Sequence, residues 1–291
     1  MPDKCSQDNK NIKKFLQGIL TNRVTFLCVI LFVLIAAAVI VIICFSSRNR
    51  AEAIDLTAAA EILDDSKWTV NEEGFKLYDD PQYRTVTGID VSEWNEDIDW
   101  DQVRKQGIEF VIVRVGYRGY VTGKFVFDER LSEYLKGASK AGLKIGAYFV
   151  SQAVNKEEAV EEAELVMEKL KGFDIEMPIY IDLEAVWDDE EEIRTEDLTK
   201  EELTEIAAAF CDTVEDAGFR GGIYANELWF GTKMDLELLS RYDIWLAKYE
   251  NVPDSDIAFN MWQYSGEGNI NGIDLWTDID VRVEKKEADN E

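Results

Sequence analysis

The chain has 291 residues, 46% of them hydrophobic, and this length and composition suffice for one large domain with appendages. Its formal net charge is -28. Residues 1–50 carry +5, which leaves -33 for residues 51–291, and such a polyanion is expected to bind neither nucleic acid nor anionic lipid headgroups. The chain has no His, which excludes a Ser-His-Asp triad and disfavours zinc, so we expect carboxylates to do the chemistry without a metal or other cofactor.

The first predicted element is a transmembrane helix over 24–45. This stretch is uncharged and long enough to cross a hydrocarbon core of ~30 Å. Small residues that could end a signal peptide, 36–38, lie inside the apolar run, so an uncleaved anchor is favoured over a cleaved signal. Five basic residues precede the span and two follow it closely, so residues 1–23 are predicted to be the cytoplasmic tail of a single-pass cell-membrane protein. The large domain is then extracellular.

Residues 46–84 are interpreted as an extracellular stalk or linker. We expect a short helix over 55–63 and packing on the main domain through Trp68, Phe75 and Tyr78. Cys211 is the one cysteine outside the tail and span, so no intrachain disulfide is expected there, and its apolar neighbours favour a buried thiol over a nucleophile. Residues 285–291 are predicted to form a disordered acidic tail.

Residues 85–284 alternate strand-like and helix-like patterns, which predicts an α/β fold with a parallel sheet buried on both faces. About eight strands in some 200 residues suggest a TIM-like β/α barrel, with its active site at the carboxyl ends of the strands. The predicted strands are 86–91, 110–115, 144–150, 179–183, 222–224, 244–247, 261–264 and 279–283, and the predicted helices are 100–106, 128–141, 156–170 and 200–217.

The acidic triplet Asp182-Leu183-Glu184 closes the apolar run 178–181. Its two carboxylates lie on one face of a strand, roughly 6 to 7 Å apart at ~3.3 Å per residue. A solvated acidic turn and a catalytic pair both fit the triplet taken alone.

Other acids and aromatics fall at the same predicted edge. Asp90 ends the first strand, Tyr148 and Tyr224 come late in the third and fifth, and Trp262-Gln263 comes late in the seventh. Each position has a structural alternative, a loop cap or a core side chain. Their shared place favours a cleft for a sugar ring, whose C–H faces stack on aromatic rings while its hydroxyls meet polar groups.

The sequence over 86–283 resembles the glycoside hydrolase family 25 lysozymes. The resemblance implies an eight-stranded barrel with incomplete helical decoration. It also implies hydrolysis of the β-1,4 bond between N-acetylmuramic acid and N-acetylglucosamine, with peptidoglycan strands as the partner. The segments that carry it are 88–92, 98–100, 110–117, 146–149, 178–184, 222–224, 244–247 and 262–265.

The resemblance also implies residue roles. It makes Glu184 the general acid and Asp182 its neighbouring carboxylate, and it adds Asp90 and Asp278 to the acid set. Two departures from the family pattern concern substrate contacts, since Asn95 stands where many members carry Gln and Asp280 where Asn is usual. The expected substrate contacts, with the rim position Trp262 included, are Tyr148, Tyr224, Trp245, Trp262 and Gln263.

Several alternatives stay open at this stage. Asp182 either attacks the anomeric carbon or orients the N-acetyl group of the substrate, which then attacks. The chain could instead be a catalytically inactive peptidoglycan-binding module, which the intact acid set disfavours. It could also be a chitinase-like barrel hydrolase, although 179–181 lack the Asp-rich strand signature of chitinases. Wall remodelling and a role in a secretion apparatus fit the anchor equally well.

Overall fold

The computed structural model describes residues 60–188 and 190–286. The predicted cytoplasmic tail, the transmembrane helix over 24–45, the first part of the stalk and most of the acidic tail lie outside these residues. Within the described ranges, no helix has the length and apolar character needed to span a membrane.

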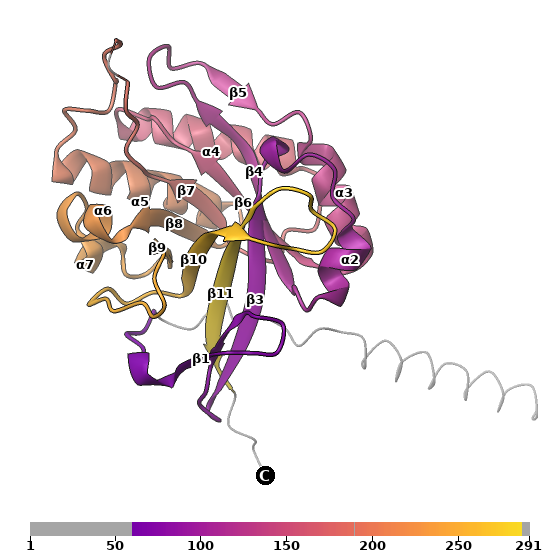
Figure 1. Ribbon diagram of the computed structural model, residues 1–291. Coiled ribbons are helices and arrows are strands. Elements are labelled where there is room, and N and C mark those ends of the chain that lie inside the picture. Colours follow the sequence, from indigo (N-terminus) through magenta and orange to yellow (C-terminus); the bar gives the residue numbers. More distant parts are fainter. Residues whose placement is uncertain (1–59, 189, 287–291) are drawn as a thin grey trace, which may run out of the picture. The chain divides into compact units, whose positions relative to one another are not determined.

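Eight strands form a closed barrel (Figure 1). They pair in the order β3-β11-β10-β9-β8-β7-β6-β4, and β3 pairs with β4 to close the ring. A short strand, β5 (Phe125–Phe127), extends β4 as a hairpin. All eight predicted strands are present and the predicted barrel is confirmed. The strands are β3 (Tyr83–Val91), β4 (Phe110–Arg118), β6 (Lys144–Val150), β7 (Ile179–Asp182), β8 (Gly221–Asn226), β9 (Asp243–Ala247), β10 (Met261–Gly268) and β11 (Thr277–Lys285).

The predicted parallel sheet is wrong for the last strand. β11 runs antiparallel to both of its neighbours, β10 and β3, while the other neighbouring barrel strands pair in parallel. The chain joins β10 to β11 through residues 269–276, which form no helix. Antiparallel neighbours need only such a short return, whereas parallel ones need a long crossover. The start of β11 therefore lies at the same rim as the carboxyl ends of the other strands.

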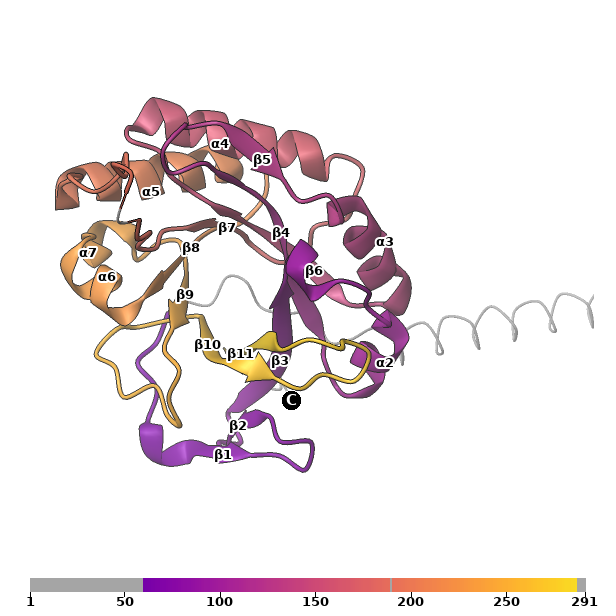
Figure 2. The ribbon, with the colours of Figure 1, turned by 45° about the horizontal axis from the view of Figure 1, so that its top comes forward.

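The helices cover only part of the barrel. In Figure 2 they lie around β4 to β9, whereas β10, β11 and β3 face the N-terminal hairpin. The four predicted helices are confirmed, but α3 begins three residues later than expected because Asp128 instead binds Arg114 and the N–H of Glu93. The helices are α2 (Trp100–Lys105), α3 (Leu131–Ala141), α4 (Lys156–Leu170), α5 (Lys200–Asp216), α6 (Glu227–Thr232) and α7 (Leu236–Leu239), with 3-10 turns η1 (Asp65–Lys67) and η2 (Glu93–Asn95).

Large side chains fill the barrel interior, and glycines on adjacent strands make room for them. A Cβ on Gly88 would lie 2.1 Å from the ring of Phe110, and one on Gly222 would lie 2.4 Å from the ring of Tyr180. The interior is thus a packed core rather than a pore. The members of this inner cluster are Val86, Phe110, Ile112, Met177, Tyr180, Trp245 and Met261.

The hairpin of β1 (Trp68–Val70) and β2 (Lys76–Tyr78) precedes the barrel. The expected packing of Trp68, Phe75 and Tyr78 is confirmed, because all three are buried and the Trp68 ring meets the Trp262 ring edge-on at 5.1 Å. The short helix predicted over 55–63 is absent at 60–63, where Glu61 instead forms a β-bridge with Phe259. This segment is therefore part of the folded domain rather than a free stalk.

The thiol of Cys211 lies in the core, as expected. It is fully buried on α5, where the Sγ is 3.4 Å from the carbonyl oxygen of Gly222. Burial raises the pKa of this thiol well above its usual value, so the group stays a thiol and not a nucleophile.

Candidate active site

Four predicted carboxylates come together at the rim where the parallel strands end. Asp90 is at the end of β3 and Asp182 at the end of β7, with Glu184 two residues further on. Asp278, the second residue of the antiparallel β11, is directly opposite Asp90 in the strand register. Because β11 runs antiparallel, Asp278 lies at this rim although it is near the beginning of its strand.

Burial and mutual repulsion favour protonated carboxyls in this cluster. Burial, and after it the charges of Asp278 and Asp280, raise the pKa of Asp90 well above its ordinary value. Burial and the charge of Glu184 do the same to the pKa of Asp182. Burial also raises the pKa of Asp278, to about 6. Each ionisation makes the next one less favourable, so the cluster keeps its protons to higher pH than isolated carboxyls would.

Glu184 has a different environment from the others. Its residue is exposed at the mouth of the site, yet its carboxylate is close enough to the cluster that local desolvation and the charge of Asp278 raise its pKa. Solvent reaches this group, whereas Asp90 and Asp182 are buried and Asp278 is half-buried. Glu184 is therefore the acid of the set that an incoming substrate can meet first.

A hydrogen-bond chain fixes Asp90. The Nε2 of Gln263 donates to Asp90 Oδ2 at 2.6 Å. The hydroxyls of Tyr224 and Tyr249 donate to Gln263 Oε1 at 2.8 and 2.9 Å. These bonds orient the Gln263 amide, so that its N–H groups must point toward the carboxylate. Gln263 and Tyr224 thus position an acid, whatever contact they make with substrate.

Trp245 and Trp262, which the sequence predicts to contact substrate, are both buried in the structure. Trp245 is 1% exposed inside the barrel, where its Nε1 donates to Asp280 Oδ1 at 2.8 Å. Trp262 is 0% exposed and its Nε1 donates to the carbonyl of Lys248 at 2.7 Å. Neither indole offers a free face to a sugar. Side chains alternate between the inside and the outside of the barrel along a strand. Because both faces of these strands are buried, the sequence does not show which residues point inward.

Tyr148 and Tyr224 are only half-buried and pack edge-on against the Trp245 ring, at centroid distances of 6.0 and 4.5 Å. They form the transition from the packed interior to the open rim. Of the predicted aromatic contacts, these two are the ones that solvent reaches.

The two departures from the family pattern have structural roles. Asp280 is fully buried below the rim, and the Trp245 indole supplies one of its hydrogen bonds. The Asn95 side chain accepts from the N–H of Ser92 at 2.9 Å and donates to the carbonyl of Trp276 at 3.4 Å. Both residues therefore support the rim from within the protein.

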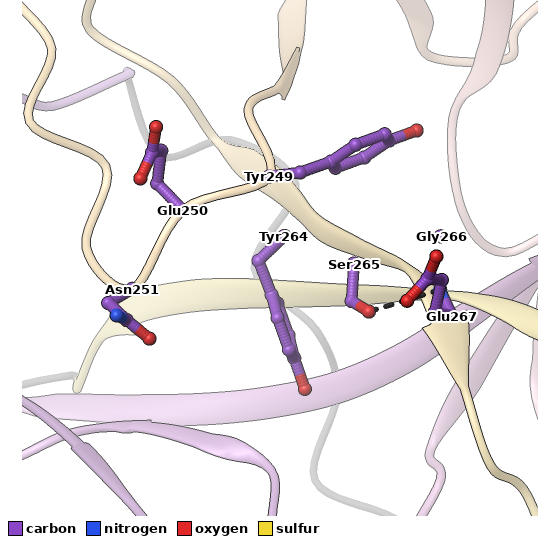
Figure 3. Close-up of a pocket in the computed structure, with 7 residues that line it drawn as sticks. All are labelled: Tyr249, Glu250, Asn251, Tyr264, Ser265, Gly266 and Glu267. Atoms are coloured by element: carbon purple, nitrogen blue, oxygen red, sulfur yellow. Dashed lines mark hydrogen bonds between the residues drawn. The ribbon is translucent and has the colours of Figure 1, made fainter.

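A hollow of about 260 Å³ opens beside Glu184. A larger one, of about 570 Å³, lies on the other side of Tyr249, between the loop after β9 and β10 (Figure 3). Both are lined mainly by polar and aromatic groups, and Tyr249 is common to them. The smaller hollow is lined by Glu184, Tyr224, Asn226, Ala247, Lys248 and Tyr249. The larger is lined by Tyr249, Glu250, Asn251, Tyr264, Ser265, Gly266 and Glu267.

In the described ranges, 60–188 and 190–286, no three His, Cys, Asp or Glu side chains are placed to hold a metal ion. The charges of neighbouring rim acids and of Arg114 shift the pKa values of Asp182 and Glu184.

Residues 89–273 match the sequence model of the glycosyl hydrolases family 25. The chain belongs to this family. The protein YegX of Escherichia coli (strain K12) is 27% identical over 205 residues, covering 69% of this chain and 71% of YegX. The autolytic lysozyme of Clostridium acetobutylicum is 24% identical over 196 residues, covering 67% of this chain and 55% of the lysozyme.

Solved structures share the fold of this family 25 hydrolase. The autolysin LytC of Streptococcus pneumoniae superposes with a TM-score of 0.60 at 24% identity, over 77% of this chain and 52% of LytC. A family 25 glycosyl hydrolase of Bacillus anthracis gives 0.58 at 22% identity, over 69% of this chain and 90% of that one. The chain thus spans about half the length of LytC.

Two residues of this family 25 hydrolase were not predicted from the sequence to lie at the site. Arg114 on β4 bonds Asp128 through Nε at 2.9 Å, and its charge lowers the pKa of both Asp182 and Glu184. Its position inside an apolar run was an available signal, because a charge is rarely buried without a partner. Tyr249 follows β9 in a loop, where no sequence pattern distinguishes it.

Proposed function

We propose that this chain is a peptidoglycan hydrolase that cleaves the β-1,4 bond between N-acetylmuramic acid and N-acetylglucosamine. The observation that carries the proposal is the cluster of Asp90, Asp182, Glu184 and Asp278 at the barrel rim of a family 25 chain. The names of relatives support the substrate, since one is an autolytic lysozyme and LytC has been solved with a synthetic peptidoglycan ligand.

In this mechanism Glu184 protonates the leaving glycosidic oxygen. Its raised pKa keeps the proton available at higher pH than an ordinary Glu would, and its exposure lets the oxygen approach. Asp90 and Asp278 are assigned the stabilisation of the oxocarbenium-like transition state. The charge of Asp278 also holds the pKa of Glu184 high. Gln263 keeps the Asp90 carboxylate in place.

Asp182 has two possible roles, attack on the anomeric carbon or orientation of the substrate N-acetyl group. Its Oδ1 is buried and makes no hydrogen bond within the protein. A buried acceptor without a donor is costly, and the N–H of an N-acetyl group would supply that donor. This supports the orienting role, in which the substrate's own carbonyl oxygen attacks.

Digestion of purified peptidoglycan with the full-length chain tests the activity. Mass spectrometry of the products identifies the new reducing end. Ends that carry N-acetylmuramic acid are expected. Ends that carry N-acetylglucosamine would place the protein in another class of hydrolase, and binding without release would favour the inactive wall-binding module.

Replacement of Arg114 by Met is expected to move the alkaline limb of the pH profile to higher pH. The guanidinium lowers the pKa of Glu184, so its removal raises that pKa further. Because a general acid acts only while protonated, activity then persists at higher pH. The measurement is kcat/KM on soluble glycan strands as a function of pH.

Two variants control this experiment. Arg114→Lys keeps a positive charge and should restore the limb toward its original position. Arg130→Met removes one positive charge from an ion pair with Glu133 and should leave the limb unchanged. An alkaline limb of Arg114→Met at the same or lower pH would contradict the assigned electrostatics.

We also propose that residues 24–45 anchor the protein in the cell membrane with the catalytic domain outside. The uncharged length of this segment and the excess of basic residues before it support the proposal. Protease added to intact protoplasts should remove the domain and leave residues 1–23 protected. Recovery of the intact chain in the culture medium would count against the anchor.

A further inference from the structure

Two tryptophans at the rim are exposed. Trp94, in η2, is 73% exposed and Trp276, just before β11, is 67% exposed. Exposed single apolar residues are common, but two indoles on neighbouring segments form a large apolar surface. Trp94 and Trp276 thus have faces available to a ligand, as do Trp187 and Tyr249, which are also exposed.

The segments that carry the two tryptophans are fixed to each other. The side chain of Asn95 donates to the carbonyl of Trp276 at 3.4 Å. The N–H of Asp99 donates to the carbonyl of Gly272 at 2.8 Å, next to a β-bridge between Ile98 and Ile273. The backbone segments that carry the two indoles are therefore held together by hydrogen bonds, so that ligand binding needs little ordering of these segments.

Their position borders the acid cluster. Trp94 is four residues beyond Asp90 and Trp276 is two residues before Asp278, and these two acids face each other across β3 and β11. The hollow beside Glu184 lies at β8 and β9, which β10 separates from β11 in the strand order. A glycan strand that enters this hollow and crosses the acids thus reaches the tryptophans next.

The negative charge around the two tryptophans restricts the class of ligand that can bind there. Glu93, Glu96 and Asp97 lie in the same turn, and the Asp97 side chain is almost fully exposed. Such a surface repels nucleic acid and anionic headgroups. It suits an uncharged ring with C–H faces and hydroxyls, because the indoles pack on the faces while the carboxylates accept from the hydroxyls.

We propose that Trp94 and Trp276 form a sugar-binding subsite, separate from the scissile bond, that stacks on a pyranose ring of the same glycan strand. The inference rests on the proposed function, since it takes the strand in the groove to be peptidoglycan. The subsite makes the enzyme prefer long strands, because a short oligosaccharide held at the acids does not reach it.

The test compares Trp94→Ala and Trp276→Ala with the wild-type chain on a tetrasaccharide and on intact glycan strands. Each variant should raise KM on strands roughly 10-fold, the loss expected for an anchoring Trp, with kcat retained. Both kinetic constants on the tetrasaccharide should stay unchanged. Trp94→Tyr keeps an aromatic face and should recover most of the affinity, and Leu238→Ala, another exposed apolar side chain, on α7, is the matched control.

Binding to insoluble peptidoglycan, measured by co-sedimentation, separates this inference from the proposed function. Weaker binding of the Trp variants supports the subsite even if the wild-type chain releases no products, in which case the proposed hydrolysis alone fails. Unchanged binding of both variants to strands overturns the subsite. Equal kinetic losses on the tetrasaccharide and the strands overturn it as well, because they would place the indoles at the scissile bond.

Discussion

Glu184→Gln is expected to lower kcat on peptidoglycan roughly 10³-fold, the size of effect found when a general acid is removed. Gln has nearly the same shape as Glu but cannot transfer a proton to the glycosidic oxygen. Because Glu184 is exposed and makes no structural hydrogen bond that the fold depends on, KM and the melting temperature should change little. Reducing-end release under saturating substrate measures the loss.

The matched control is Glu196→Gln, an exposed glutamate in the same β7–α5 loop that should keep full activity. A substrate with a good leaving group, such as an aryl glycoside, should recover much of the lost rate, since its departure needs no proton. Turnover of Glu184→Gln near the wild-type rate would move the general acid to another carboxylate of the rim.

The strands and the four longer helices could be predicted because their signals are local. Apolar runs such as 144–150 and caps such as Thr199 before α5 depend on neighbouring residues alone. The direction of β11 was missed because the pattern of an apolar strand is the same in both directions. Direction is set by the connection from β10, and the sequence over 269–276 shows only that it holds no helix.

The rim acids could be predicted from their places at strand ends together with the family resemblance. The burial of Trp245 and Trp262 could not be predicted, because a strand buried on both faces gives no alternation by which to assign the inward side. Tyr249, Trp94 and Trp276 lie in loops and turns, whose side-chain exposure depends on packing between distant segments, such as the Asn95 bond to the Trp276 carbonyl. Their place at the site became visible only from the structure.

A buried ion pair at the opposite end of the barrel is expected to have the largest effect on stability. Asp243 at the start of β9 and Arg282 on β11 are 0% and 1% exposed. They form two parallel bonds, Nη1–Oδ1 at 3.0 Å and Nη2–Oδ2 at 2.8 Å, and the hydroxyl of Tyr180 donates to Asp243 Oδ1 at 2.8 Å. The pair joins three strands of the ring, β7, β9 and β11.

Asp243→Asn is expected to lower the free energy of unfolding by about 3 kcal/mol, because it leaves the guanidinium buried without its main counter-charge. Glu284, whose Oε1 is 3.5 Å from Arg282 Nε, compensates for part of the loss, which places the effect at the low end of the range for such pairs. Urea unfolding followed by circular dichroism measures the change. Tyr180→Phe removes one neutral donor and should cost only about 1 kcal/mol.

The double variant Asp243→Leu with Arg282→Met distinguishes a charge effect from a shape effect. If the uncompensated charge causes the destabilisation, removal of both charges should be less harmful than Asp243→Asn alone, since the unpaired guanidinium is gone and Glu284 keeps its ion pair with Arg84. If the double variant is the least stable, the pair acts by its hydrogen-bond geometry in closing the ring. In either case the pH profile of the folded enzyme should not change, because the rim acids that set it are at the far end of the strands. A shift in that profile would show that the ion pair also influences the active site.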